Sequence, residues 1–225
     1  MSGGLWLIIP AYNEGEVIAN VVAEVRRQYQ NVVVIDDCSK DDTGEAALRG
    51  GAIVLRHPIN LGQGAALVTG TRFALSRGAE YLVTFDADGQ HRVEDIAVLR
   101  ERQRETGADI VIGSRFLGVA IDIPPVRRFV LKLAVQFTRI TSGVQLSDAH
   151  NGFRLLTRKA AQQIKLKQNR MAHASEIINQ IAVLGLKTAE APVTIRYTEY
   201  SLRKGQKLSN AVNILWEMFL ARMRK

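Results

Sequence analysis

Short apolar runs alternate with segments of helical periodicity along the first half of the chain. The runs are typical of buried strands, and the segments between them repeat apolar residues at the three- and four-residue spacing of a helix. Predicted strands cover residues 5–10, 31–37, 51–57, 81–85 and 108–115, and predicted helices cover 14–28, 42–49, 62–77 and 93–106. This alternation favours an α/β fold with a wound, mostly parallel sheet flanked by helices.

The second half, which begins near Pro124-Pro125, is less regular. An amphipathic helix is predicted over 126–141, with the cations Arg127, Arg128, Lys132 and Arg139 between its apolar positions. Residues 152–164 have a mixed pattern, 173–186 predict a helix, 190–198 a strand, and 208–224 a helix rich in large apolar side chains. We therefore divide one domain into two halves, 1–122 and 123–225.

Polar residues gather where the predicted strands of the first half end. The first strand runs into Pro10-Ala11-Tyr12-Asn13-Glu14, the second ends at Asp36-Asp37, the fourth at Asp86-Ala87-Asp88, and the fifth at Gly113-Ser114-Arg115. A single Asp in such a turn is explained as a helix cap, but paired carboxylates exceed what capping needs. In wound sheets ligands bind outside the carboxyl ends of the strands, so this edge is the predicted site.

The carboxylates point to two kinds of contact. Asp86 and Asp88 are suited to Mg²⁺ or Mn²⁺, with Gln90 or His91 close enough to add a contact. A carboxylate at Asp36-Asp37 can hydrogen-bond a base or a ribose. The G-x-G-x-x-G fingerprint and the Walker lysine are both missing, which disfavours a nicotinamide dehydrogenase and a P-loop NTPase. Gly62 and Gly64 are expected to open a helix tightly near a ligand, or simply to start it.

Charge is divided unevenly between the halves. The formal net charge of +8 arises from −5 over residues 1–122 and +13 over 123–225. The basic half suggests a polyanionic partner, anionic lipid or nucleic acid, although a solvated basic surface would look the same. The single cysteine, Cys38, excludes an internal disulfide and fits a reducing cytoplasm. Neither a secretory leader nor a membrane-spanning run is predicted.

Six motifs in order carry a resemblance to a known family. They read IIPAYNE, VVVIDDCSKD, NLGQGAA, DADGQH, GSR and NGFR, between about residues 5 and 160. This order resembles the family 2 glycosyltransferases, in particular the branch of dolichol-phosphate mannose synthase and the polyprenyl-phosphate glycosyltransferases. Two positions depart from the pattern: Gln63 replaces a lysine common in the N-x-G-K-G turn, and Gln206 replaces a serine in Arg203-Lys204-Gly205-Gln206-Lys207.

The resemblance implies a GT-A type fold and inverting transfer from a nucleoside-diphosphate sugar, with a divalent metal on the diphosphate. Residues 1–122 would then bind the nucleotide sugar and 123–225 the acceptor. The implied donor contacts are Pro10, Tyr12, Glu14, Asp36, Asp37, Gly64, Asp86 and Ala87, and the implied metal contacts are Asp86, Asp88 and Gln90. Phosphate groups of the acceptor would meet Arg115, Arg127, Arg154, Arg203 and Lys207.

The nature of the acceptor decides whether a base is required. A lipid phosphate is largely deprotonated near neutral pH and needs only cations to position it. A sugar hydroxyl would need a carboxylate, for which Asp148 is the candidate; its alternative role is to pair with a neighbouring cation. The residues taken as catalytic are therefore Asp86, Asp88, Asp148 and Arg115.

The main hypothesis is an enzyme at the cytoplasmic face of the membrane that transfers a sugar to a polyprenyl phosphate. The basic helix would contact anionic lipid, and the helix over 208–224 could pair two copies. The alternatives are transfer to a glycan hydroxyl, a nucleotidyltransferase, and a non-enzymatic basic module for a polyanion. We expect no nucleic-acid partner, because paired carboxylates without a metal repel phosphates.

Overall fold

A computed structural model describes residues 4–149, 151–170 and 172–204. The strands are β1 (Leu5–Ala11), β2 (Val32–Asp36), β3 (Ile53–Arg56), β4 (Tyr81–Thr84), β5 (Ile110–Ile121), β6 (Arg154–Thr157) and β7 (Thr188–Arg196). The helices are α1 (Ile18–Arg26), α2 (Thr43–Arg49), α3 (Gln63–Ser76), α4 (Asp95–Thr106), α5 (Pro125–Ser142), α6 (Arg158–Gln163), α7 (His173–Leu184) and α8 (Glu199–Lys204).

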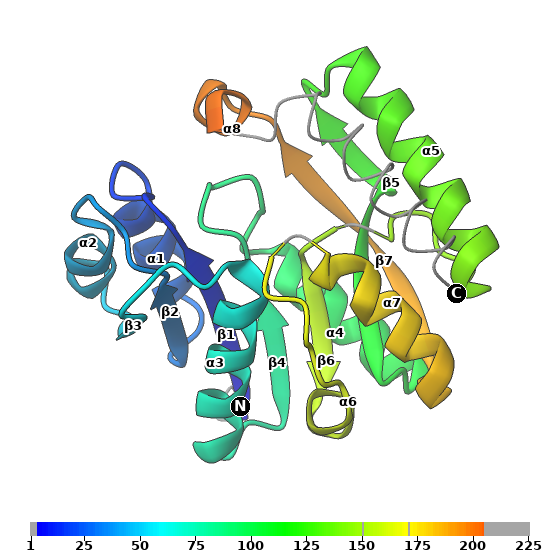
Figure 1. Ribbon diagram of the computed structural model, residues 1–225, viewed down its shortest axis with the longest axis horizontal. Helices are drawn as coiled ribbons and strands as arrows, with labels where there is room; N and C mark the ends of the chain where they lie inside the picture. The colour runs from blue at the N-terminus through cyan, green and yellow to red at the C-terminus, as the bar shows by residue number, and fades with distance from the viewer. Residues whose placement is uncertain (1–3, 150, 171, 205–225) are drawn as a thin grey trace.

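The described strands form one sheet in the order β3-β2-β1-β4-β6-β5-β7 (Figure 1). The pairs β2–β3, β1–β2, β1–β4 and β5–β7 are parallel, whereas β6 runs antiparallel to both β4 and β5. Strands from both halves of the sequence therefore share the sheet. The carboxyl ends of β1, β2 and β4 lie at the same edge, which is where the sequence predicts the site.

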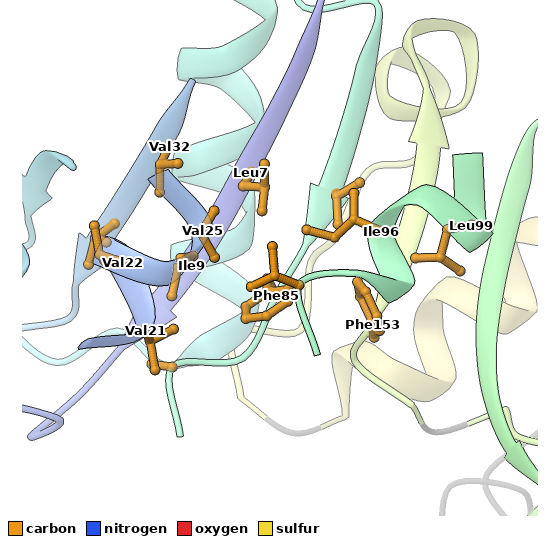
Figure 2. Close-up of a cluster of buried hydrophobic side chains, with 14 of the residues drawn as sticks. Leu7, Ile9, Val21, Val22, Val25, Val32, Phe85, Ile96, Leu99 and Phe153 are labelled. Carbon is orange, nitrogen blue, oxygen red and sulfur yellow. The ribbon is translucent and has the colours of Figure 1, made fainter. Parts of the chain in front are cut away.

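Side chains alternate between the two faces of the sheet, as the period of a strand requires. Leu7 and Ile9 of β1 pack with α1, α2 and α4 on one face, whereas Trp6 and Ile8 pack with α3 and α6 on the other. Figure 2 shows the first of these clusters, in which Phe85 after β4 lies near α1 and α4. This double burial explains the continuous apolar runs of β1 and β2.

Within the described residues the predicted elements are present, with two corrections. The fifth strand, predicted to end at 115, continues to Ile121, because the chain bulges against β7 between Ser114 and Val119. A Cβ on Gly118 would lie 2.2 Å from the carbonyl oxygen of Val193, so only glycine fits there. The mixed segment 152–164 contains the antiparallel strand β6 followed by α6. The predicted helix over 208–224 lies outside the described residues.

Among the described residues, we find no helix with both the length and the apolar character needed to cross a bilayer.

Candidate active site

The loop after β4 carries the paired carboxylates to the carboxyl edge of the sheet. Ala87 is buried, which anchors the loop, while Asp86 and Asp88 on either side of it are partly exposed. The backbone of Gly152 passes so close to Asp86 that an added Cβ would lie 3.0 Å from its carboxylate oxygens. The N-G-F-R segment and the D-x-D loop are thus brought together from positions 66 residues apart in the sequence.

The two carboxyl groups have opposite pKa shifts. Burial and the negative charge of Asp86 raise the pKa of Asp88 to about 6. Burial would raise the pKa of Asp86 too, but the hydrogen bond and charge of His91 and the charges of Arg154 and Arg115 outweigh it and hold that pKa below its usual value. A divalent cation would relieve the repulsion that raises the pKa of Asp88, so these side chains fit one.

His91 is a buried partner of Asp86. Its Nε2 lies 2.9 Å from Oδ2 of Asp86, and its ring packs against both Phe85 and Phe153, which also contact each other. A backbone bridge to Ile195 holds it from a third side. The imidazole therefore contacts the carboxylate from within the core. It orients Asp86.

Replacing His91 by Phe should preserve the aromatic packing and remove the hydrogen bond to Asp86. Hydrogen bonds to charged groups contribute about 1.5–3 kcal/mol, so we expect kcat/KM for the sugar donor to fall roughly 10- to 100-fold. Steady-state kinetics with a varied donor measure this. His91→Gln, which retains a donor group, should recover part of the loss; equal losses in both variants would contradict the orienting role.

Asp36 and Asp37 differ in their surroundings, although both are buried. Asp36 accepts the backbone N–H of Ser39 at 2.8 Å, and its Oδ2 lies 3.3 Å from Nε of Arg56. Asp37 accepts the N–H groups of Leu61 and Gly62 at 2.9 and 2.7 Å and contacts His57 Nδ1 at 2.7 Å. In this arrangement Asp37 holds the turn before α3 against the end of β2.

The glycine turn before α3 is covered by another loop. Gly62 has a φ of +99°, and the N–H of Gly64 donates to the carbonyl oxygen of Asn169 at 2.8 Å. A Cβ on Gly64 would lie 2.1 Å from the carbonyl oxygen of Gln168. Because these glycines have no side chain, the two backbone segments can approach closely, and Gly64 lies beneath residues 168–169.

Helix α8 lies against the turn after β1. The hydroxyl of Tyr200 donates to Glu14 Oε2 at 2.6 Å, and Nζ of Lys204 lies 2.8 Å from Glu14 Oε1. Lys204 also donates to the carbonyl oxygens of Tyr12 and Asn13. Arg203 is exposed and 3.6 Å from Glu16. The C-terminal part of the described chain thus covers the motif that begins at Pro10.

Asp148 and Arg115 form an ion pair in the interior. Nε of Arg115 lies 2.6 Å from Oδ2 of Asp148, and the side chains are 9% and 1% exposed. Arg115 also donates to the hydroxyl of Tyr197 at 2.6 Å. The carboxylate of Glu190 accepts the backbone N–H groups of Ser147 and Asp148, which fixes the loop that carries Asp148. Burial would lower the pKa of Arg115, but the charge of Asp148 outweighs it and raises that pKa.

Arg154 has a different environment, because no described carboxylate lies within ion-pair distance of it. The residue is 3% exposed; it donates to the carbonyl oxygen of Ala149 at 3.1 Å, and its Nε has no hydrogen-bond partner among the described residues. Burial lowers its pKa to about 10, against the opposing charges of Asp86 and Asp148. It remains a cation in the floor of the site.

A cationic cleft lies between α5 and the bulged part of β5. Arg128, Lys132 and Arg139 line it from α5, and Phe116 and Ser147 line it from the other side. Its volume is about 380 Å³. Arg127 also lies in α5, and Lys207 lies outside the described residues. Ser147 is adjacent to Asp148, so this cleft is close to the buried ion pair.

Several residues that shape the site cannot be identified from the sequence. Glu190 and Tyr200 belong to no recognisable motif. The pairing of β7 with β5 places Glu190 in the site, and the position of α8 places Tyr200 there. The sequence indicates His91 as a further contact at the D-x-D loop because of its adjacency, but it does not predict the burial of His91 against Asp86. Among described residues, His, Cys, Asp and Glu form no group of three that could hold a metal. A cation here would depend on donor phosphates for further ligands.

Comparison with known proteins places this arrangement in a family. The family model described as "Glycosyl transferase family 2" matches residues 6–165, which contain every motif from β1 to β6. The chain belongs to this family. The predicted resemblance is thereby confirmed, and the protein is a glycosyltransferase.

Two relatives of this glycosyltransferase have nearly its length. One is the UDP-N-acetylglucosamine–dolichyl-phosphate N-acetylglucosaminyltransferase of Methanococcus voltae, 30% identical over 98% of this chain and 97% of the relative. The other is the undecaprenyl-phosphate mannosyltransferase of Micrococcus luteus, 32% identical over 83% of this chain and 81% of the relative. The name of each of these two relatives includes a lipid phosphate.

A solved structure has the same fold. Glucosyl-3-phosphoglycerate synthase of Mycobacterium tuberculosis superposes with a TM-score of 0.71 at 19% identity, over 92% of this chain and 74% of that one. The likeness confirms the predicted GT-A type fold.

Proposed function

We propose that this glycosyltransferase moves a sugar from a nucleoside-diphosphate donor to the phosphate of a polyprenyl phosphate. The observation that carries the proposal is the buried Arg115–Asp148 pair beside a cationic cleft. In this pair the only carboxylate proposed as a base is already occupied by an arginine. An acceptor that needs no deprotonation suits such a site, and the two lipid-phosphate relatives support the same acceptor class.

The donor is proposed to lie along the carboxyl edge, with its diphosphate facing Asp88. A divalent metal held by Asp88, with Asp86 and Gln90 nearby, would supply charge stabilisation to the leaving diphosphate. Structures of glucosyl-3-phosphoglycerate synthase with Mn²⁺ and UDP-glucose show a fold of this type combined with a metal and a nucleotide sugar. Glu14, held by Tyr200 and Lys204, borders the same edge.

The acceptor phosphate is proposed to bind in the cleft on α5. Its cations, Arg128, Lys132 and Arg139, provide the charge, and guanidinium groups can bind phosphate oxygens in a bidentate manner. An oxygen of the bound phosphate attacks the anomeric carbon from the face opposite the diphosphate, which inverts that centre. Arg115 is fixed by Asp148 and Tyr197 and contributes positive charge between the cleft and Asp86.

The same helix offers a surface for the membrane that holds the lipid. Val126, Phe129 and Leu133 of α5 are 57%, 63% and 46% exposed, and Leu117 and Val119 of β5 are 55% exposed each. Arg128 and Lys132 are interspersed with these apolar residues. We propose that this face rests on the anionic leaflet, where each cation contributes about 1 kcal/mol.

The proposal is tested by incubating the chain with Mn²⁺, radiolabelled nucleotide sugars and a short polyprenyl phosphate. Lipid-extractable label is the expected product. Lys132→Ala and Arg128→Ala should raise the KM for the lipid phosphate and leave the donor KM unchanged, whereas Lys159→Ala, a distant exposed cation, should change neither. Label transferred only to saccharide hydroxyls would overturn the acceptor assignment, and transfer of the nucleotide to an acceptor with release of sugar 1-phosphate would favour a nucleotidyltransferase.

A further inference from the structure

A cavity extends from the active site along the face of the sheet that carries α3, α6 and α7 (Figure 1). Its volume is about 170 Å³. Gln63 and Leu75, near opposite ends of α3, both line it, so it follows that helix for about 18 Å. Since a cavity of roughly 150 Å³ holds a benzene-sized ligand, this one has room for part of a hexose.

The polar side chains of the cavity lie in two groups. The end next to the carboxyl edge of the sheet is lined by Gln63, Thr84, Asp86, Arg154 and His173. The far end is lined by Thr71, Arg72 and Lys165, and the last two are exposed cations. Leu67 on α3 and Ile177 on α7 lie between the groups. A ligand beside Asp86 therefore meets the first group and not the second.

His173 is the first residue of α7, and its ring is held in one protonation state. The residue is 5% exposed, and its Nδ1 lies 2.8 Å from the carbonyl oxygen of Arg170. A carbonyl oxygen can only accept a hydrogen bond, so Nδ1 carries the proton. Burial lowers the pKa of His173, which keeps the ring neutral near pH 7. Nε2 is therefore a hydrogen-bond acceptor.

This acceptor is unused within the described part of the chain. Nε2 of His173 has no hydrogen-bond partner among the described residues and, unlike Nε of Arg154, it is not fully enclosed. The backbone around it is fixed, because the carboxylate of Glu176 accepts the N–H groups of Lys167 and Gln168 at 3.0 and 2.9 Å. The structure thus keeps a free acceptor at the end of the cavity that Asp86 lines.

The chemistry of this nitrogen selects the group that it can bind. A hydroxyl can donate its hydrogen to Nε2. A carboxylate or a phosphate has no hydrogen to donate when ionised, and its charge would also be repelled by Asp86. In the proposed function the sugar of the donor lies beside Asp86, and hydroxyl groups are what a hexose presents.

We propose that His173 is a specificity-determining residue, whose Nε2 accepts a hydrogen bond from one hydroxyl of the transferred sugar. The inference rests on the proposed function, because that function places the sugar of the donor in this end of the cavity. It adds the residue that selects the sugar, and it requires a hydroxyl at one position of the ring.

Two variants separate the two nitrogens of the ring. The amide of asparagine reaches about as far as Nδ1, and that of glutamine about as far as Nε2. His173→Asn should therefore keep the bond to the carbonyl oxygen of Arg170 and lose the acceptor, which lowers kcat/KM for the sugar donor about 5- to 100-fold. His173→Gln should recover part of that loss.

The experiment measures lipid transfer by the full chain with Mn²⁺. The parent donor is whichever of UDP-glucose, UDP-N-acetylglucosamine and GDP-mannose reacts fastest, and it is compared with its monodeoxy and monodeoxyfluoro analogues. Fluorine cannot donate a hydrogen bond, so at one ring position both analogues should lose about 5- to 100-fold in kcat/KM. With His173→Asn the parent and these two analogues should react alike. Val183→Ala, at the exposed end of α7, should retain the full discrimination.

The outcomes separate the inference from the proposed function. An equal loss for the parent and every analogue in His173→Asn would assign His173 a structural role and overturn the inference alone. Deoxyfluoro analogues that react as well as the parent at every position would also overturn it. Should His173→Asn melt well below the unmodified chain, His173→Phe, which retains the ring shape, replaces it.

Transfer to lipid from none of the three parent donors would overturn the proposed function itself. The same comparison is then made on dissociation constants of the donors with Mn²⁺, which titration calorimetry measures without turnover. A deoxy analogue that binds more weakly than its parent to the unmodified chain, and equally to His173→Asn, would still support the role of His173. The absence of any such analogue would overturn it.

Discussion

Asp88→Asn is expected to lower kcat/KM for the sugar donor about a thousandfold. The substitution keeps the shape of the side chain and removes the charge that is proposed to face the diphosphate. Losing an electrostatic contact that stabilises developing charge typically costs two to three orders of magnitude in rate. The loss of a carboxylate ligand should also weaken Mn²⁺ binding, which titration calorimetry measures without turnover.

A matched control distinguishes the effect of losing the charge at Asp88 from the effect of losing any one negative charge. Glu101 is exposed on α4 and, among the described residues, pairs only with Arg104, so Glu101→Gln removes one negative charge far from the carboxyl edge. It should leave both Mn²⁺ binding and turnover within about twofold. The metal assignment would be wrong if Asp88→Asn bound Mn²⁺ as tightly as the unmodified chain.

Asp148→Asn is expected to destabilise the fold and to leave the pH dependence of turnover unchanged in shape. Removing one partner of a buried ion pair costs about 3–5 kcal/mol, because the remaining charge is left without compensation. Urea unfolding measures that loss. With a lipid phosphate as acceptor no base is required, so the basic limb of the kcat–pH profile should not shift, while the acceptor KM rises as Arg115 loses its orientation.

The double variant Arg115→Met/Asp148→Asn tests the structural part of this prediction. With both partners removed no unpaired charge stays buried, so the double variant should be more stable than Asp148→Asn alone. A contrary result would be Asp148→Asn with full stability and a turnover reduced more than a thousandfold. That result would assign Asp148 as a base and favour a hydroxyl acceptor.

The strand ends were predictable because they depend on local patterns. A buried strand needs consecutive apolar residues, and the next polar residues must then lie at the edge of the sheet. Asp86 and Asp88 follow such a run directly, so their position at the carboxyl edge of β4 could be predicted. The extension of β5 was not predictable, because Gly118 continues the strand only through its close approach to Val193.

The sequence pattern does not predict roles that depend on contacts with residues elsewhere in the chain. Asp37 and Asp86 look alike as strand-end acids, yet one holds the turn before α3 and the other faces the cavity. His91 could be identified as a neighbour of the D-x-D loop, but its contact with Asp86 depends on the aromatic packing around it. Likewise, the residue type of Asp148 allows both a base and an ion-pair partner, and only the tertiary structure shows its pairing with Arg115.

The sequence by itself determines the wound sheet, its acidic edge and the family of this protein, because periodicity and motif order are local properties of the chain. The tertiary structure alone decides which charges are paired, which backbone segments cover the glycines, and where space is left beside Asp86. Those properties depend on contacts between segments far apart in the chain, such as β7 against β5 and the 168–169 loop over α3. Desolvation and pairing at these contacts set the charge and shape of the site.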